Sequence, residues 1–140
     1  MNQVTTLLID YYRDFGRQDH RRLHDIYSDN IAFKDPIHSI SGIESLVEYF
    51  TISSRGLISC EFTFTDQLPS SEQMWLKWDM QYRHQRINRG QPQTLSGATH
   101  ICFQEKVYFH QDFYDLGAMV YEHVPILGAG VRWVKQRLAR

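Results

Sequence analysis

The apolar periodicity of this chain changes once, near Leu57, and that change constrains the fold more than any other feature. Before Leu57, apolar residues recur every three or four positions, as on one face of a helix. After it they alternate with polar residues, beginning with Ile58, Cys60, Phe62 and Phe64, which is the pattern of a half-buried strand. The sequence therefore predicts an α+β protein in which helices precede a strongly curved antiparallel sheet.

Three helices are predicted before the sheet. The first covers Val4 to Phe15, where the apolar residues share one face. Asp19 is placed to cap the second helix, whose buried stripe ends at Tyr27. The third follows the capping-box pattern of Ser41 and Glu44. These helices are expected to pack on one face of the sheet.

A short strand and four longer ones are predicted. The short strand ends at Asp35, between the second and third helices. A helical extension is expected over about 116–140, and the whole chain, 1–140, is predicted to be a single domain. The four longer strands begin near Leu57, Leu76, Thr94 and Val107, and the last of them ends at Asp115.

The hairpin turns predict which residues lie opposite each other, because a slip of one residue would reverse the two faces of a strand. A two-residue loop at Glu105 and Lys106 places Thr99 opposite Asp112. A four-residue loop at 88–91 sets the register of the preceding hairpin. The predicted pairs are Phe103 with Tyr108, Ile101 with His110, Met80 with Thr99, and Trp78 with Ile101.

One face of this sheet is predicted to hold a pocket for a small hydrophobic or aromatic ligand, because it combines apolar residues with the polar His110 and Asp112. In the alternative, the helices fill this face and the two polar side chains bond to each other or to the helices. The opposite face, with Trp75, His100 and Phe113, suits a homodimer contact. The predicted pocket residues are Trp78, Met80, Tyr82, Thr99, Ile101, Phe103, Tyr108 and Tyr114.

Composition and motifs narrow the function classes. The 15 basic and 16 acidic residues leave a net charge near −1, which does not favour nucleic-acid binding. Cys60 and Cys102 fit no metal spacing, and His20 and His24 lack a third ligand, so no metal is expected. No phosphate loop or nucleotide motif implies a cofactor. No signal peptide or membrane span is recognised, and a cytoplasmic location is expected.

Asp35 is the first candidate for a catalytic base. The proline that follows it biases its backbone toward an extended conformation, which gives the carboxylate a reproducible direction at the strand end. In the alternative, Asp35 terminates the strand and accepts hydrogen bonds from nearby backbone amides.

The order of elements and several short motifs resemble the nuclear transport factor 2-like superfamily, in its SnoaL-like and ketosteroid isomerase-like branch. The resemblance covers essentially the whole chain and implies the cone fold. The residues that carry it are Gly16-x-x-Asp19, Tyr27-Ser28-Asp29-Asn30, Asp35-Pro36, Gly42 and His100-Ile101-x-Phe103.

The resemblance also implies roles for individual residues. Ketosteroid isomerases carry their general base at the position of Asp35 and a hydrogen-bonding tyrosine at the position of Tyr11. Their protonated acid aligns with Thr99, so the missing carboxyl would come from Asp112 on the neighbouring strand. In SnoaL-like cyclases, polar residues of the sheet take part, and His110 with Asp112 is the comparable pair here.

Two functions follow as expectations. The first is an isomerase, cyclase or lyase that moves a proton next to a carbonyl, with Asp35 as base and Tyr11, Asp112 and His110 assisting. The second is a non-catalytic module that binds a ligand or a protein and dimerises through its sheet.

Overall fold

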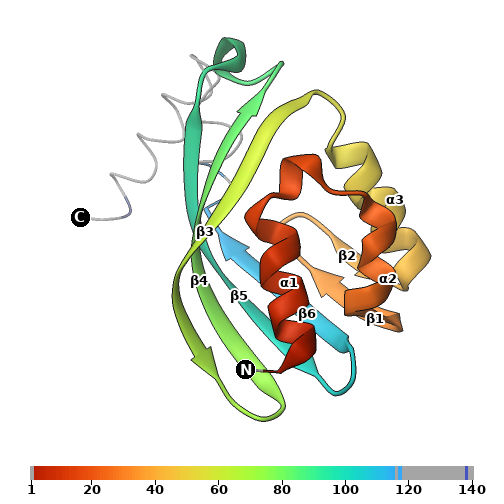
Figure 1. Cartoon of the computed structure of the whole chain (residues 1–140). Coiled ribbons are helices and arrows are strands. Elements are labelled where there is room, and N and C mark those ends of the chain that lie inside the picture. Colours follow the sequence, from red (N-terminus) through yellow and green to blue (C-terminus); the bar gives the residue numbers. More distant parts are fainter. Residues whose placement is uncertain (1, 116, 118–137, 139–140) are drawn as a thin grey trace.

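A computed structural model of the protein describes residues 2–115, together with 117 and 138. Helices lie on the concave side of a curled, unclosed sheet (Figure 1), which confirms the predicted α+β cone. The helical extension predicted over about 116–140 falls outside the described residues, apart from 117 and 138. No helix within the described part of the chain has the length and apolar character needed to cross a bilayer.

The three predicted helices are α1 (Gln3–Arg13), α2 (Leu23–Ile26) and α3 (Ile43–Ser53), with short 3-10 turns at Phe15–Arg17 and His20–Arg22. Two details differ from the sequence prediction. Tyr27 begins a strand instead of ending the second helix. Ser41 pairs with Ala32 in a strand, so the capping box does not form, and Gly42 starts α3 with a φ of 92°.

Six strands form one sheet in the order β2-β1-β6-β5-β4-β3. β1 and β6 are parallel, which differs from the predicted antiparallel sheet, and β2 was not predicted. The pairs β3–β4, β4–β5 and β5–β6 are antiparallel as predicted, and β1–β2 is antiparallel too. A 3-10 turn at Asn88–Gly90 lies between β4 and β5. The strands are β1 (Tyr27–Lys34), β2 (Ser39–Ser41), β3 (Leu57–Pro69), β4 (Gln73–His84), β5 (Gln93–Phe103) and β6 (Val107–Tyr114).

The register between β5 and β6 is the predicted one through most of its length, with Thr99 opposite Asp112 and Ile101 opposite His110. Only the pair of residues next to the β5–β6 loop differs from the prediction. Phe103 pairs with Val107 because the loop spans three residues, 104–106, instead of two. Tyr108 is then an extra residue in β6, a β-bulge that restores the predicted register.

The register between β4 and β5 differs from the prediction by four residues, since Met80 pairs with Leu95 instead of Thr99. The connection spans residues 85–92, a longer segment than the predicted 88–91. The backbone N–H of Gln85 donates to Gly56, outside the β4–β5 ladder, and Pro92 has no N–H to donate to it. Because the register differs by an even number of residues, each side chain stays on the predicted face of the sheet.

The hydrophobic core lies between α1 and the sheet, and it includes Leu76, Ile101 and Phe103. A second, smaller cluster forms around Trp78, Tyr82 and neighbouring apolar residues. The interior of the cone is therefore divided between a filled part under α1 and a part where the candidate site lies.

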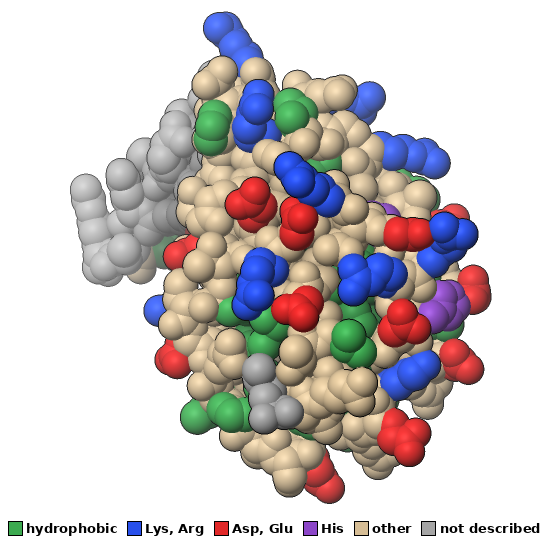
Figure 2. Space-filling model, in the orientation of Figure 1, with side chains coloured by type: hydrophobic (Ala, Val, Ile, Leu, Met, Phe, Trp, Pro, Cys, Tyr) green, Lys and Arg blue, Asp and Glu red, His purple; other side chains and the backbone are tan. Residues whose placement is uncertain are grey.

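Basic and acidic side chains alternate over the face seen in Figure 2, and no purely basic patch forms there.

Gly97 tests the packing of this second part, because a Cβ there would lie 2.5 Å from the Trp78 ring and 2.6 Å from the carbonyl oxygen of Phe113. We expect Gly97→Ala to lower the free energy of unfolding by ~1–3 kcal/mol through overpacking. Chemical denaturation measures the change. Thr94→Ser, at an exposed position of the same strand, serves as the control and is expected to stay within ~0.5 kcal/mol. Equal stability of Gly97→Ala and the wild type would contradict this packing.

Candidate active site

A cavity of about 170 Å³ lies between the helices and the second cluster. Two carboxylates line it: Asp35, just past the end of β1, and Asp112 on β6. The two residues come from parallel neighbouring strands, which brings them to one space although they are far apart in the sequence. Most of the remaining wall is apolar, and its aromatic members are Tyr12, Phe15, Phe33, Tyr49, Phe50, Phe62, Trp78, Tyr82 and Tyr114.

Asp35 is held by hydrogen bonds on both carboxylate oxygens. Its Oδ1 accepts from the backbone N–H groups of Ile37 at 2.8 Å and His38 at 2.7 Å. Its Oδ2 accepts from the hydroxyl of Tyr49 on α3. The side chain is only 4% exposed. Asp35 therefore caps its turn and also contributes to the cavity wall, so the two roles considered from the sequence coexist.

Asp112 is held on one oxygen only. Its Oδ1 accepts from the Thr99 hydroxyl at 2.6 Å and lies 2.7 Å from His110 Nε2. Among the described residues, no hydrogen bond involves its Oδ2. The pairing of Thr99 with Asp112 thus brings a carboxyl next to the threonine, as predicted for the neighbouring strand.

The hydrogen bonds behind Asp112 form a continuous buried chain. The Tyr12 hydroxyl lies 2.8 Å from that of Tyr27, which lies 2.8 Å from His110 Nδ1. A carboxylate only accepts, so His110 donates from Nε2 and its Nδ1 accepts from Tyr27. Tyr27 in turn accepts from Tyr12. Every donor in this arrangement therefore points toward Asp112, whereas the protonated acid that the resemblance implied would itself be a donor.

The Trp78 indole adds a second branch to this chain. Its Nε1 donates to the Thr99 hydroxyl at 2.8 Å, and this leaves the threonine proton for Asp112. Both branches end on the same oxygen, Oδ1. The orientation of the Asp112 carboxylate is consequently fixed from two sides, while its other oxygen keeps its lone pairs available.

Two tyrosine hydroxyls lie near the carboxylates, and that of Tyr49 already donates to Asp35. Burial raises the pKa of Tyr114, and the charges of Asp35 and Asp112 raise this pKa further. Burial also raises the pKa of Tyr49, together with its hydrogen bond to Asp35 and the charge of that carboxylate. Both side chains therefore stay protonated at neutral pH and can donate a hydrogen bond.

The structure does not bring every predicted residue to this cavity. The Tyr11 hydroxyl bonds to His20 and is absent from the cavity wall, whereas its neighbour Tyr12 faces the cavity. Ile101 and Phe103 pack in the core under α1. Tyr108 is 42% exposed on the outside, because the β-bulge turns it away.

Thr99 and His110 support the cavity wall from behind, in a small hollow beside Asp112. The predicted pocket residues that do line the cavity are Trp78, Met80, Tyr82 and Tyr114.

Sequence reasoning missed the partners of the two acids. Tyr49 reaches Asp35 from α3, and no spacing in the sequence indicates this contact. Tyr27 was assigned to a helical stripe, although its position four residues before the buried Ile31 also fits a strand. With Tyr27 in a strand parallel to β6, its approach to His110 follows from the sheet order.

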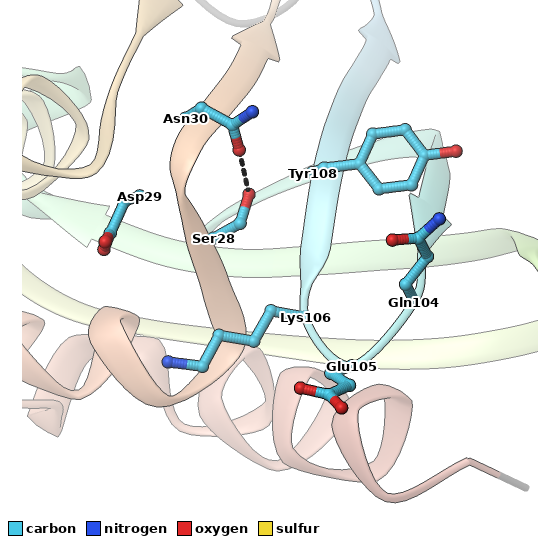
Figure 3. Close-up of a pocket in the computed structure, with 7 residues that line it drawn as sticks. All are labelled: Ser28, Asp29, Asn30, Gln104, Glu105, Lys106 and Tyr108. Atoms are coloured by element: carbon cyan, nitrogen blue, oxygen red, sulfur yellow. Dashed lines mark hydrogen bonds between the residues drawn. The ribbon is translucent and has the colours of Figure 1, made fainter.

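A wider hollow of about 930 Å³ lies outside the cone, between β1 and the β5–β6 loop (Figure 3). It is open, and its lining side chains are polar or charged, with the aromatic Tyr108 among them. Ser28 donates to Asn30 within it, and Lys106 Nζ donates to the carbonyl of His24 at 2.6 Å. Because ligand pockets are lined mainly by hydrophobic and aromatic side chains, the aromatic-walled cavity is the stronger candidate.

Metal and thiol chemistry find no support among the described residues. No group of three or more potential metal ligands gathers there. His20 is held by Tyr11 and by Ser54, whose hydroxyl lies 3.0 Å from its Nε2. Cys60 lines the cavity, but burial raises the pKa of its thiol to about 12, which keeps it protonated.

The buried chain makes a prediction for Tyr27. We expect Tyr27→Phe to lower the free energy of unfolding by ~1–3 kcal/mol, because His110, at 1% exposed, loses the donor to its Nδ1. Tyr108→Phe removes a hydroxyl from an exposed ring of β6 and is expected to change stability by less than ~0.5 kcal/mol. Thermal and chemical denaturation compare the two variants. Equal losses would contradict the inferred chain.

Comparisons with solved structures show the fold. A protein from Catenulispora acidiphila with a ketosteroid isomerase-like fold, crystallised with trimethylamine, superposes with a TM-score of 0.73 at 14% identity, covering 86% of this chain and 91% of that one. A protein of unknown function from Burkholderia pseudomallei, with the nuclear transport factor 2-like fold, gives 0.74 at 12% identity, covering 86% and 96%.

A candidate SnoaL-like polyketide cyclase from Shewanella putrefaciens gives a TM-score of 0.71 at 15% identity, covering 85% of this chain and 94% of that one. No curated protein matches the sequence significantly. The family model of the SnoaL-like domain matches residues 8–107. The chain therefore belongs to the SnoaL-like domain family.

Proposed function

We propose that the protein binds a small molecule in the aromatic-walled cavity and moves a proton next to a carbonyl group, without a cofactor. The observation that carries this proposal is that Asp35 and Asp112, from different strands, line this one cavity. A largely apolar wall strengthens the interactions of both carboxylates with a bound substrate. Membership in the SnoaL-like family supports a ligand-binding role.

Asp35 acts as the general base in this proposal. Its Oδ2 accepts a proton from the carbon that lies between the carbonyl and a C=C bond of the substrate. The electron pair of the broken C–H bond forms a C=C bond to the carbonyl carbon, and the π pair of the carbonyl moves onto its oxygen. Tyr114 donates a hydrogen bond to the oxygen as it becomes negative, in the role the resemblance assigned to Tyr11. Asp35 then returns the proton to the far carbon of the original C=C bond while the C=O bond re-forms, which completes an isomerisation. Tyr49 keeps the carboxylate oriented throughout.

The cavity volume limits the substrate. Ligand pockets for drug-sized molecules span roughly 300–1,000 Å³, whereas this cavity holds about 170 Å³. An engineered cavity of about 150 Å³ accommodates benzene, so a substrate of one small ring or a short branched chain fits here. The trimethylamine bound by the Catenulispora neighbour is a molecule of this size class.

A second function is favoured by the hydrogen bonds of Asp35. Both of its oxygens are occupied, as expected for a module that binds a ligand without turning it over. On the outer face, Trp75 stacks on His100 with ring centroids 4.5 Å apart, and both Trp75 and Phe113 are exposed. This aromatic surface supports the predicted homodimer, and a cytoplasmic location remains part of either proposal.

Hydrogen–deuterium exchange tests the catalytic proposal. In D2O, the wild type is expected to accelerate exchange of the protons next to the carbonyl of small ketones such as cyclohexanone, followed by NMR. Asp35→Asn keeps an oxygen for the two backbone amides, and we expect it to lower this rate by ~100-fold or more because the base is lost. Circular dichroism confirms folding.

Asp29→Asn removes an exposed carboxylate near the outer groove and is the matched control, with an unchanged rate expected. Equal rates for Asp35→Asn and the wild type would exclude Asp35 as the base. No acceleration by the wild type with any small ketone would favour the non-catalytic module.

A further inference from the structure

The charge of the cavity wall is unbalanced. Asp35 and Asp112 contribute two carboxylates, and none of the described lining residues is Lys or Arg. His84 also lines the cavity, but its Nε2 donates to the carbonyl of Arg55 at 3.1 Å and its Nδ1 accepts from Arg86 N–H at 3.0 Å. Both ring nitrogens of His84 are thus used by backbone groups.

Among the described residues, the groups that bond to the two carboxylates include no Lys or Arg. His110, the nearest titratable neighbour of Asp112, lies 2.8 Å from the Tyr27 hydroxyl through its Nδ1 and 2.7 Å from Asp112 through its Nε2. His38 Nδ1 lies 3.5 Å from Asp35, but its side chain is 45% exposed and points partly to solvent. The two carboxylates of the described wall are therefore not matched by a fixed cation.

From this charge and the aromatic wall, we infer that the natural ligand carries a positive charge, as a small alkylammonium or other organic cation. The inference rests on the proposed ligand-binding role of the cavity and names the class of its ligand. Aromatic ring faces attract cations, most strongly where water is excluded, and Trp is the best of them. Trp78, Tyr114 and Phe50 supply such rings in the same wall as the carboxylates.

Asp112 is the group that would hold the cation. Thr99 and His110 approach its Oδ1 from behind, and its Oδ2 has no donor among the described residues. A ligand with one ammonium group would supply the missing partner for this oxygen. Asp35, already bonded on both oxygens, is left for the proton transfer proposed above.

Other ligand charges fit this space less well. A carboxylate or phosphate ligand would lie beside two carboxylates in a largely apolar cavity, where repulsion is less screened than in water. A neutral apolar ligand would displace water from both carboxylates and give them nothing in return. A cation removes the repulsion and replaces the lost hydration, and the cavity of about 170 Å³ admits a group of the size of trimethylammonium.

Two probes of equal shape test the inference on the wild-type protein. Choline carries a positively charged nitrogen where 3,3-dimethylbutan-1-ol has a neutral carbon. The two molecules are otherwise matched in shape and apolar area. Isothermal titration calorimetry is expected to give at least about tenfold tighter binding of choline, which corresponds to ~1.4 kcal/mol. NMR shifts of the Trp78 indole locate each probe in the cavity.

Two variants then test whether Asp112 supplies the negative charge that binds the cation. Asp112→Asn is expected to lose most of the preference for choline, whereas Asp79→Asn, on the same sheet but bonded to Ser96 at its surface, is expected to retain it. If Asp112→Asn fails to fold, the comparison of the two probes on the wild type still decides the question.

The outcomes separate this inference from the proposed function. Tighter binding of choline supports the cationic ligand. Equal binding of both probes in the cavity overturns the cationic ligand and leaves the ligand-binding role intact. Binding of neither probe overturns the inference and counts against a ligand-binding cavity as well.

Discussion

The pairing of β5 with β6 is the constraint on which the candidate site depends. It sets Thr99 beside Asp112 and Ile101 beside His110, so that two polar side chains of β6 face the interior of the cone. The bulge at Tyr108 compensates for a loop that is one residue longer than a tight hairpin. Without that compensation, the inward and outward faces of β6 would exchange, and neither His110 nor Asp112 would reach the cavity.

Within this register, the direction of the hydrogen bonds gives the site its electrostatic character. Tyr12, Tyr27 and His110 form one branch and Trp78 with Thr99 the other, and both end on Asp112. Each buried donor has a partner, and no described buried side-chain nitrogen or oxygen is left unsatisfied. The network therefore stabilises the fold and keeps a carboxylate oriented toward the cavity. These two effects cannot be separated by removing Asp112, since its loss would leave several buried donors without acceptors.

Periodicity was sufficient to predict the helices and the faces of the long strands, because these follow from burial. The pairing of Thr99 with Asp112 was predicted from a two-residue loop, and it holds because the bulge at Tyr108 compensates for the third loop residue. The β4–β5 register was not predictable in the same way, since the length of the turn depends on left-handed backbone at Asn88 and Arg89. The sequence also did not predict which of Tyr11 and Tyr12 faces the cavity. Neighbouring helical residues point about 100° apart, and the rotation of α1 on the sheet decides which one faces the cavity. The contact of Tyr49 with Asp35 depends on the placement of α3, which no local pattern encodes.

The central claim is that the donors converge on Oδ1 of Asp112, so that its carboxyl group acts as an acceptor at the cavity wall. Neutron crystallography of the deuterium-exchanged protein at neutral pH tests this most directly, because it locates the exchangeable protons. The account predicts deuterium on His110 Nε2, on the Tyr27 hydroxyl directed at Nδ1, and none on Asp112. Deuterium on either oxygen of Asp112, or on His110 Nδ1 in place of Nε2, would contradict it.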